Sequence, residues 1–241
     1  MINQIQHKKV ISFVYIFIIL VAAITALLFF VHYKYYSKNA ILKQANLLLE
    51  SGDYLGARKR YKRIINKDPE NFSAHFGLGM SYCAETIFKT DLGMAKTEDW
   101  HPAIYHMTIA MNLNENDQVK QTLAILHFNL GTFFKKENNQ DAAIESLKQA
   151  VAYDPTLLKA LNLLGAMYHE SGNLEDAEYY YKKTIELRPD YAMAHFNLGA
   201  IAWARKDFEA AVSYFQKAVS LAPENTYFQN WLAKAEKHAG K

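Results

Sequence analysis

Three histidines recur in one short motif, and imidazole nitrogens are the commonest metal ligands among side chains. The motif reads HFGLG from His75, and HFNLG from His127 and from His195. A metal site would require the three side chains to converge on one ion. They occupy the same position of three repeating units, and stacked units would hold them apart by at least the thickness of one unit. We therefore predict that these histidines pack between helices and bind no metal.

Two further histidines, His101 and His106, follow an acidic pair. On a helix a separation of five residues corresponds to about 140° around the axis, so the two side chains cannot share one ion. Pro102 instead indicates the first turn of a helix, with Asp99 or Trp100 just outside it. His101 and the residues around it remain the site of an alternative in which the chain is a hydrolase or a transferase.

The other residues that could do chemistry form no catalytic pattern. The single cysteine, Cys83, excludes an intramolecular disulfide and a cysteine-based zinc site, and we predict that it is a small buried hydrophobe. Gly77-Leu78-Gly79 lacks the third glycine and the preceding strand of a nucleotide-binding loop. HExxH and GxSxG motifs are absent. The sequence therefore predicts no enzyme activity and no cofactor.

The composition is typical of a folded protein without a strong charge bias. Of 241 residues, 51% are hydrophobic and 21% are charged, and the formal net charge is +3. Such a chain is not disordered. Its charge is too small for the dense basic face with which proteins bind nucleic acid. The length allows one or two domains or a single repeat array.

A long uncharged run lies near the N-terminus. Residues 10–31 read VISFVYIFIILVAAITALLFFV. As a helix they would extend about 33 Å, enough for a hydrocarbon core of about 30 Å. The apolar stretch of a cleaved signal peptide is shorter, at roughly 7–15 residues. We therefore predict a retained single-pass transmembrane helix at 10–31, after a short tail at 1–9 and before a juxtamembrane linker at 32–37.

Basic residues near this run bear on its orientation. Two lysines precede it, whereas Lys34, Lys38 and Lys43 come after it. The larger number favours a cytoplasmic C-terminal part, in a cell membrane such as the bacterial inner membrane. A short tail with two lysines is equally typical of anchors that export the rest of the chain. A basic stretch further along is expected to contact anionic lipids, through Arg58, Lys59, Arg60, Lys62 and Arg63.

Prolines reveal an internal repeat in the rest of the chain. Pro155, Pro189 and Pro223 are equally spaced along the sequence. A fixed period of about 34 residues indicates stacked supersecondary units. Between the prolines the apolar spacing is helical, and Ser171-Gly172-Asn173 separates one helix from the next. The sequence therefore predicts a series of helix pairs.

This pattern resembles the tetratricopeptide repeat family. Its repeating unit has a Leu-Gly pair and an aromatic residue on the first helix, and alanine, an aromatic residue, alanine and proline on the second. Residues 158–191 fit this unit, with a threonine in place of the second alanine; 192–225 and 124–157 also fit, and 38–71 and 72–117 match more loosely. About twelve extra residues around 84–95 separate the two helices of the second unit. A spacer at 118–123 is expected to lengthen the next helix.

The resemblance implies an all-α fold. The N-terminal transmembrane helix would be followed by a right-handed α-solenoid of about five tetratricopeptide units, at 38–225, and by a capping helix at 226–241. At the position of the recurring histidines the family usually has a large packing residue, and Leu161 fills that position in the fourth unit. The insertion at 84–99 is expected to be a tolerated surface loop, with a second contact surface as the alternative.

The resemblance also implies a concave groove, built from the first helices, that binds a segment of a partner protein. Asn129 and Asn197 resemble the asparagine ladder of O-linked N-acetylglucosamine transferase, which Leu163 breaks in the fourth unit. The family's clamp for chaperone tails is not assembled, because Asn46 and Lys159 lack its other members. The predicted groove residues are Phe76, Met80, Phe128, Asn129, Lys159, Asn162, Met193, Phe196, Asn197 and Trp203.

Together these features predict a non-enzymatic, membrane-anchored scaffold or adaptor that docks a protein or peptide partner near the bilayer. Two alternatives remain open. The chain could be an assembly factor or structural subunit of a membrane protein complex, or it could be the hydrolase or transferase with its site at His101.

Overall fold

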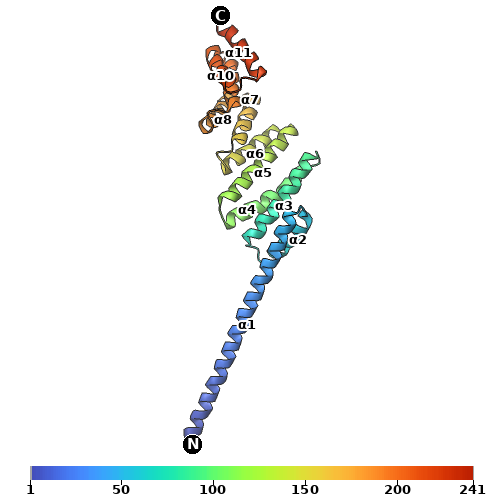
Figure 1. Cartoon of the computed structure of the whole chain (residues 1–241), viewed down its shortest axis with the longest axis vertical. Coiled ribbons are helices and arrows are strands. Elements are labelled where there is room, and N and C mark those ends of the chain that lie inside the picture. The colour runs from blue at the N-terminus through green and yellow to red at the C-terminus, as the bar shows by residue number, and fades with distance from the viewer. Residues whose placement is uncertain (1, 241) are drawn as a thin grey trace. The chain divides into compact units, whose positions relative to one another are not determined.

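The computed structural model describes the backbone of residues 2–240 and the side chains of residues 19–31 and 38–240. Every regular element in the described backbone is an α-helix, which confirms the all-α part of the predicted fold class (Figure 1). Contacts divide the chain into two compact units, Met1–Ser81 and Tyr82–Lys241. The first contains α1 (Ile2–Glu50), α2 (Tyr54–Ile65) and the start of α3 (Phe72–Asp91).

The second unit continues α3 and adds a series of helix pairs. The first helices of the last three pairs are α5 (Asp117–Lys136), α7 (Leu158–Glu170) and α9 (Ala192–Ala204). Their partners are α6 (Gln140–Tyr153), α8 (Leu174–Leu187) and α10 (Phe208–Leu221), before which comes α4 (Thr97–Leu113) and after which comes α11 (Thr226–Ala239). The spacer at 118–123 is helical and lengthens α5, as predicted.

Helix α1 runs without a break from Ile2 to Glu50, so the residues at 32–37 are helical and not a separate linker. The predicted transmembrane segment at 10–31 lies within this helix, and the side chains of its residues 10–18 are outside the described residues. In the described part of the chain, no helix has both the length and the apolar character that crossing a membrane requires.

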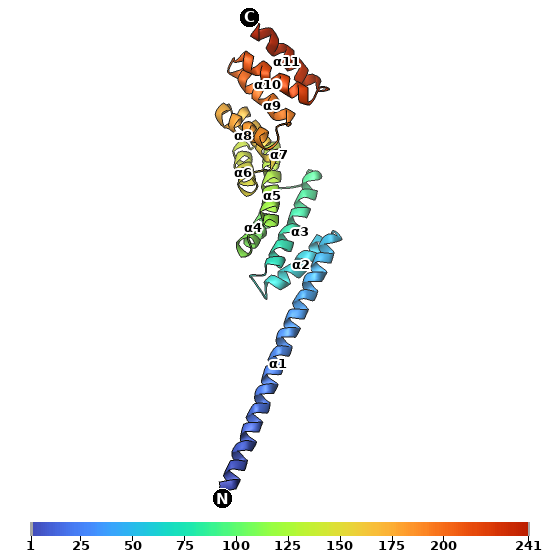
Figure 2. The ribbon, with the colours of Figure 1, turned by 60° about the vertical axis from the view of Figure 1, so that its left-hand side comes forward.

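In the first unit, α2 lies beside the C-terminal part of α1 (Figure 2). Tyr61 of α2 is fully buried, and its hydroxyl donates a hydrogen bond of 2.7 Å to the Asn46 side chain on α1. Burial raises the pKa of Tyr61 to about 12, so the hydroxyl stays protonated and remains a donor. Lys38 of α1 pairs with Asp68, which follows α2. These contacts fix α1 and α2 as one hairpin.

Each second helix of the last three pairs begins at a side-chain cap. The capping residues of successive pairs, one repeat apart along the chain, are Asn139, Asn173 and Asp207. The side chain of each accepts a hydrogen bond from the backbone N–H three residues further on. A cap of this kind stabilises a helix by about 1 kcal/mol, because it satisfies one of the free N–H groups of the first turn. The period seen in the prolines therefore recurs in the capping residues.

The residue before each of these caps has a left-handed backbone. The φ angle is 58° at Asn138, 79° at Gly172 and 64° at Lys206. This conformation ends the first helix of a pair and turns the chain toward the second. Only Gly172 adopts it without a steric penalty, since it has no Cβ atom.

Glycine in the Leu-Gly pair lets the two helices of a pair approach closely. A Cβ atom on Gly165 would lie 2.7 Å from Cε1 of Tyr181, and one on Gly131 would lie 2.8 Å from Cγ of Leu147. Both distances are shorter than any van der Waals contact allows. The large residue of the second helix therefore fills the space that the missing side chain leaves.

The insertion is mostly helical, so its prediction as a surface loop is wrong. It extends α3 to Asp91, and only residues 92–96 separate α3 from α4. Asp99 holds this region together, because its carboxylate accepts hydrogen bonds from Lys89 Nζ at 2.6 Å and from the Lys96 backbone N–H at 2.9 Å. The Thr86 hydroxyl donates to the Asp99 carbonyl at 2.9 Å.

The start of α4 also differs from its prediction. The helix begins at Thr97, so Asp99 and Trp100 lie inside it and Pro102 stands beyond its first turn. The physical reason is the Asp99 carboxylate, which satisfies the Lys96 N–H and lets the helix begin before the proline. Trp100 is 1% exposed, which makes it one of the largest core residues of the second unit.

Candidate partner-binding surface

Two of the recurring histidines pack at the start of a first helix. His75 and His195 are buried, and their Nε2 atoms lie 3.0 Å from the Pro69 carbonyl oxygen and 2.9 Å from the Pro189 carbonyl oxygen, respectively. Each histidine thus ties the start of a first helix to the turn that precedes it. Since Pro69 and Pro189 both stand six residues before a histidine, one sequence spacing produces both contacts.

No proline stands six residues before His127. That position lies inside α5, which already begins at Asp117. Its ring stacks on Tyr153 with 5.6 Å between centroids. Burial lowers the pKa of His127, which favours the neutral ring. Of the second pair of histidines, His101 is exposed and His106 stacks on Tyr82. Across the described residues, no three His, Cys, Asp or Glu side chains are grouped as metal ligands.

Two of the predicted groove asparagines lie next to each other. The Asn197 amide on α9 donates to the Asn162 side-chain oxygen on α7 at 3.4 Å, and both residues are half-buried. A primary amide has two N–H donors and an oxygen with two lone pairs. The contact uses one donor of Asn197 and one lone pair of Asn162, so both amides keep donors and acceptors for another molecule.

Exposed side chains flank these asparagines at one position of each first helix. Lys159 and Met193, both predicted, occupy equivalent positions of successive repeats, and Met193 is 43% exposed. Ile125 occupies the same position one repeat earlier and is 47% exposed. The prediction missed Ile125, although the repeat spacing alone would have found it. We call the surface formed by Ile125, Asn129, Lys159, Asn162, Met193 and Asn197 the first-helix face.

Phe196 is not part of this surface, and its prediction as an exposed groove residue is wrong. Its side chain is 6% exposed and stacks on Phe228 of α11, with 4.7 Å between ring centroids. Trp203 is half-buried and meets Trp231 of α11 at 5.7 Å. The ammonium group of Lys234 lies over both tryptophan rings. The capping helix α11 covers the end of α9, where a further repeat would otherwise pack.

The remaining predicted aromatic and methionine residues are half-buried. Phe128 packs against the core between α6 and α7, which includes Ala160 and Leu164. Phe76 stacks on Phe72, its neighbour one turn away, at 5.9 Å. Phe76 and Met80 belong to the first unit, so they are outside the first-helix face as defined above.

A pocket of about 170 Å³ adjoins the first-helix face at Asn129. From α5 it is lined by Asn129, one of the predicted groove residues, and by Thr132, Phe133 and Lys136. The insertion forms the opposite wall, through Ile87, Thr90 and Asp91 of α3 and Trp100 of α4. We call it the insertion pocket. The helical extension of α3, in place of the predicted loop, therefore encloses this pocket.

Several polar groups of the insertion pocket are available to a ligand. The Asn129 amide, the Asp91 carboxylate and the Lys136 ammonium group have no hydrogen bond or ion pair to any other described residue. The indole nitrogen of Trp100 is also buried without a partner among the described residues. A buried N–H group without an acceptor costs about 1–3 kcal/mol, but this nitrogen has almost no accessible surface and is not among the groups open to a ligand.

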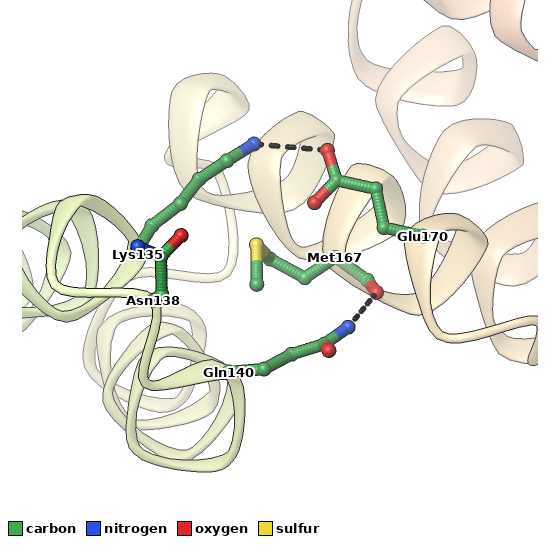
Figure 3. A pocket seen from close by; sticks show the side chains of 5 residues that line it. All are labelled: Lys135, Asn138, Gln140, Met167 and Glu170. Atoms are coloured by element: carbon green, nitrogen blue, oxygen red, sulfur yellow. Dashed lines mark hydrogen bonds and ion pairs between the residues drawn. The ribbon is translucent and has the colours of Figure 1, made fainter.

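Contacts at the turns hold neighbouring helix pairs together (Figure 3). Lys135 at the end of α5 pairs with Glu170 at the end of α7 over 3.1 Å, and the Gln140 amide donates to the Met167 carbonyl at 3.2 Å. They border a pocket of about 150 Å³. Because its charged groups already pair with each other, this pocket is better explained as a junction between repeats than as a ligand site.

The next junction is held by ion pairs. Arg205 at the end of α9 contacts Glu178 of α8, which also pairs with Lys182. The hydrogen bonds from Lys182 and Arg205 lower the pKa of Glu178, so this carboxylate is charged at neutral pH. The ion pair between Arg205 and Glu178 therefore links α9 to α8, the partner of α7.

Comparisons with known proteins agree with this architecture. Models of the tetratricopeptide repeat match residues 42–84, 124–157 and 156–224, which together are more than half of the chain. No curated protein matches the sequence significantly.

Three solved structures show the same fold. The MamA protein is 24% identical, with 79% of this chain and 94% of that chain covered and a TM-score of 0.50. YrrB, described as a TPR protein with an unusual peptide-binding site, is 21% identical, with coverages of 82% and 90% and a TM-score of 0.50. A tetratricopeptide repeat protein from Parabacteroides merdae is 17% identical, with coverages of 85% and 74% and a TM-score of 0.50. The chain belongs to the tetratricopeptide repeat family.

Proposed function

We propose that this protein is a non-enzymatic adaptor that binds an extended segment of a partner protein on its first-helix face. The observation that carries the proposal is the pair of amides on Asn162 and Asn197, which are adjacent and keep free donors and acceptors. A peptide backbone presents alternating N–H and C=O groups whatever its side chains are. Two neighbouring amides can therefore hold an extended chain with little dependence on its sequence.

Side chains around the amides would add area and selectivity. Ile125 and Met193 offer exposed apolar surface, and methionine adapts to different partners because its side chain is flexible. Lys159 favours an acidic residue in the segment. The insertion pocket, with a volume of about 170 Å³, has room for one large side chain of the partner beside Asn129. YrrB, which has the same fold, is described as having a peptide-binding site, and this supports a similar use here.

The proposal includes a membrane anchor at residues 10–31, supported by the absence of charged residues from this run. Anchoring would raise the local concentration of the adaptor for partners in the same membrane. The greater number of lysines after the run favours a cytoplasmic location of the repeats.

Selection of peptides on the purified full chain tests the surface. A displayed random-peptide library is enriched on the wild type, and the dissociation constants of the enriched peptides are then measured on variants. Asn197→Ala should weaken binding about threefold to tenfold, because each hydrogen bond contributes roughly 0.5–1.5 kcal/mol. Asn129→Ala should act similarly. Gln216→Ala, at an exposed position of α10, is the matched control and should change nothing.

The outcome that contradicts the proposal is equally specific. If both asparagine variants bind the enriched peptides as tightly as the wild type does, the first-helix face is not the binding surface. Competition between a peptide and a cross-linker placed at Met193 locates the site independently. A bound peptide should reduce cross-linking at Met193 and leave it unchanged at Gln216.

The anchor is tested separately. A membrane-spanning helix should keep the protein in the membrane fraction during alkaline extraction, and removal of residues 1–31 should release it. Protease added to intact cells or to spheroplasts then reports the side on which the repeats lie. Extraction of the full chain at alkaline pH would show that residues 10–31 do not span the membrane.

A further inference from the structure

A second pocket, between α1 and α2, is lined by cations, and the described residues of its wall include no acidic one. It has a volume of about 240 Å³ and is bordered by Ile41 and Gln44 of α1 and by Lys59, Arg60 and Arg63 of α2. The basic residues share one side of α2 because positions i and i+4 stand above each other on a helix, and position i+1 flanks them. We call this site the basic pocket.

One of its cations is held in place. The Gln44 side-chain oxygen accepts a hydrogen bond of 3.3 Å from Nε of Arg60. That contact orients the guanidinium plane and leaves its two terminal nitrogens for another acceptor. Lys59 and Arg63 are exposed and have no hydrogen bond or ion pair to another described residue. The pocket thus combines one oriented guanidinium with two further cations.

Several cations elsewhere in the described chain pair with a carboxylate, whereas the described residues that line the basic pocket include none. Lys38, Lys89 and Lys182 each pair with a carboxylate. Among the described residues that line the basic pocket, three positive charges converge without a negative one, and their mutual repulsion favours an anion between them. An arginine fork can donate two parallel hydrogen bonds to a phosphate or to a carboxylate, and a phosphate group has enough oxygens to accept from more than one fork.

We propose that the basic pocket binds a phosphate group, with Arg60 and Arg63 as its main donors and Gln44 as the residue that positions Arg60. Of the five basic residues expected to contact lipids, Lys59, Arg60 and Arg63 line the pocket. The phosphate is therefore expected at one defined site and not along the whole basic face of α2. Helix α1 contributes the uncharged residue Gln44 to that site.

The position of the pocket bears on the source of the phosphate, and this step rests on the proposed anchor. Ile41 follows Val31 by ten residues of one continuous helix, which corresponds to about 15 Å along its axis. The head-group layer of a bilayer is roughly 5–7 Å thick on each side. A long arginine side chain that extends toward the bilayer covers most of the remaining distance. A phospholipid head group is therefore within reach, and a soluble phosphate has the same chemistry.

Arginine footprinting on the full chain tests the proposal. The protein is reconstituted into vesicles of phosphatidylcholine, and the modification of each arginine by phenylglyoxal is measured by mass spectrometry. Inorganic phosphate is added in one arm. In the other arm the vesicles contain equal amounts of phosphatidylcholine, whose phosphate is neutralised by its own choline group, and phosphatidic acid, whose head group is a phosphate alone. Arg188, which is exposed at the end of α8, is the internal control.

Each outcome has a defined meaning. Protection of Arg60 and Arg63, but not of Arg188, by phosphatidic acid alone identifies the phosphate of a lipid head group. The same protection by inorganic phosphate in phosphatidylcholine vesicles identifies a soluble phosphate. If neither arm protects Arg60 and Arg63 more than Arg188, the proposal is overturned. Alkaline extraction of the same vesicles reports anchoring, so a missing anchor and an inactive pocket are distinguished.

Variants show whether the pocket itself is responsible. The concentration of phosphate or phosphatidic acid that halves the acetylation of Lys59 is measured by mass spectrometry. Arg60→Gln combined with Arg63→Gln should raise this half-protecting concentration about 30-fold, given roughly a fivefold effect for each basic side chain. Lys217→Gln combined with Lys237→Gln removes the same charge from exposed positions of α10 and α11 and should have little effect. Equal effects of the two double variants would show that only net charge matters and would refute the site.

Gln44 provides a further distinction, since its replacement by leucine changes no charge. Gln44→Leu should weaken protection several-fold, because Arg60 would lose the acceptor that orients it. Gln44→Glu should abolish protection, since a carboxylate would pair with Arg60 in place of phosphate. If Gln44→Glu protects as well as the wild type does, Arg60 is not a phosphate ligand.

Discussion

Replacement of Gly199 by alanine has two effects on the free energy of unfolding, and they act in opposite directions. Gly199 is on α9, and in a helix interior alanine is more favourable than glycine by about 1 kcal/mol. Helix propensity alone therefore predicts that Gly199→Ala stabilises the protein. The packing of the helix pair predicts the opposite, because the new Cβ atom would lie 2.6 Å from both Cδ1 and Cε1 of Phe215.

The aromatic ring has little room to move away from the new methyl group. Phe215 is fully buried, with the ring of Phe196 at 5.2 Å and that of Trp231 at 6.0 Å. Overpacking of a core in this way costs roughly 1–3 kcal/mol, and the short distance and confined ring place this site in the upper part of that range. After subtraction of the gain in helix propensity, Gly199→Ala should lower the free energy of unfolding by about 1–2 kcal/mol.

Urea unfolding of the purified full chain, followed by far-ultraviolet circular dichroism, measures this difference. Ala233→Gly, at an exposed position of α11, measures the propensity effect alone and should cost about 1 kcal/mol. Phe215→Leu removes part of the ring. In that background Gly199→Ala should be less destabilising than in the wild type, because the two residues are in direct contact.

One result would refute this reasoning. If Gly199→Ala raises the unfolding midpoint by as much as Ala233→Gly lowers it, the contact with Phe215 carries no energetic cost. The close approach of α9 and α10 would then not depend on the missing side chain. An equal effect of Gly199→Ala in the wild type and in the Phe215→Leu background would lead to the same conclusion.

Three further predictions concern single residues. Lys206→Gly should raise the free energy of unfolding by about 1 kcal/mol, because φ is 64° and a left-handed backbone is unfavourable for a residue with a Cβ atom; urea unfolding measures it. Hydrogen bonds from Lys89 and from the Lys96 backbone lower the pKa of Asp99, so its stabilisation is present above the unfolded pKa of about 4 and is lost as the pH falls through the folded value. Asp99→Asn should therefore lower the unfolding midpoint at neutral pH, and the difference from wild type should shrink in acid. Burial raises the pKa of Cys83 to about 11, so a thiol reagent at neutral pH should modify it far more slowly than in urea-unfolded protein, as mass spectrometry would show.

Much of the repeat architecture could be predicted from local sequence. The repeat period, the Leu-Gly pairs and the polar caps depend on each residue's own conformational preference and on neighbours three or four positions away. For this reason α7 and α9 begin close to the positions that the pattern indicates. The insertion departed from the period, and its local sequence did not reveal whether it was a loop or a longer helix. The contacts of Asp99 with Lys89 and Lys96 across the turn decided that question.

Prediction of the candidate surface was less complete. Asn129, Asn162 and Asn197 could be identified because they stand on the first helices of the repeats. Phe196 stands at the same register as Phe128, yet its exposure depends on which element packs next to it. Residues of α11 bury Phe196, whereas Phe128 is only half-buried. Equivalent positions in a repeat therefore have different environments at its end and in its interior.

The sequence by itself determined the helix pairs, their period, the family and the structural role of His75 and His195, because these depend on short-range spacing. Tertiary structure alone decided that the insertion encloses a pocket beside Asn129, that α11 covers Phe196, and that Gln44 of α1 orients Arg60 of α2. Each of these features joins residues from different helices. Such contacts depend on how helices pack against one another, and residue spacing within one helix carries no information about them.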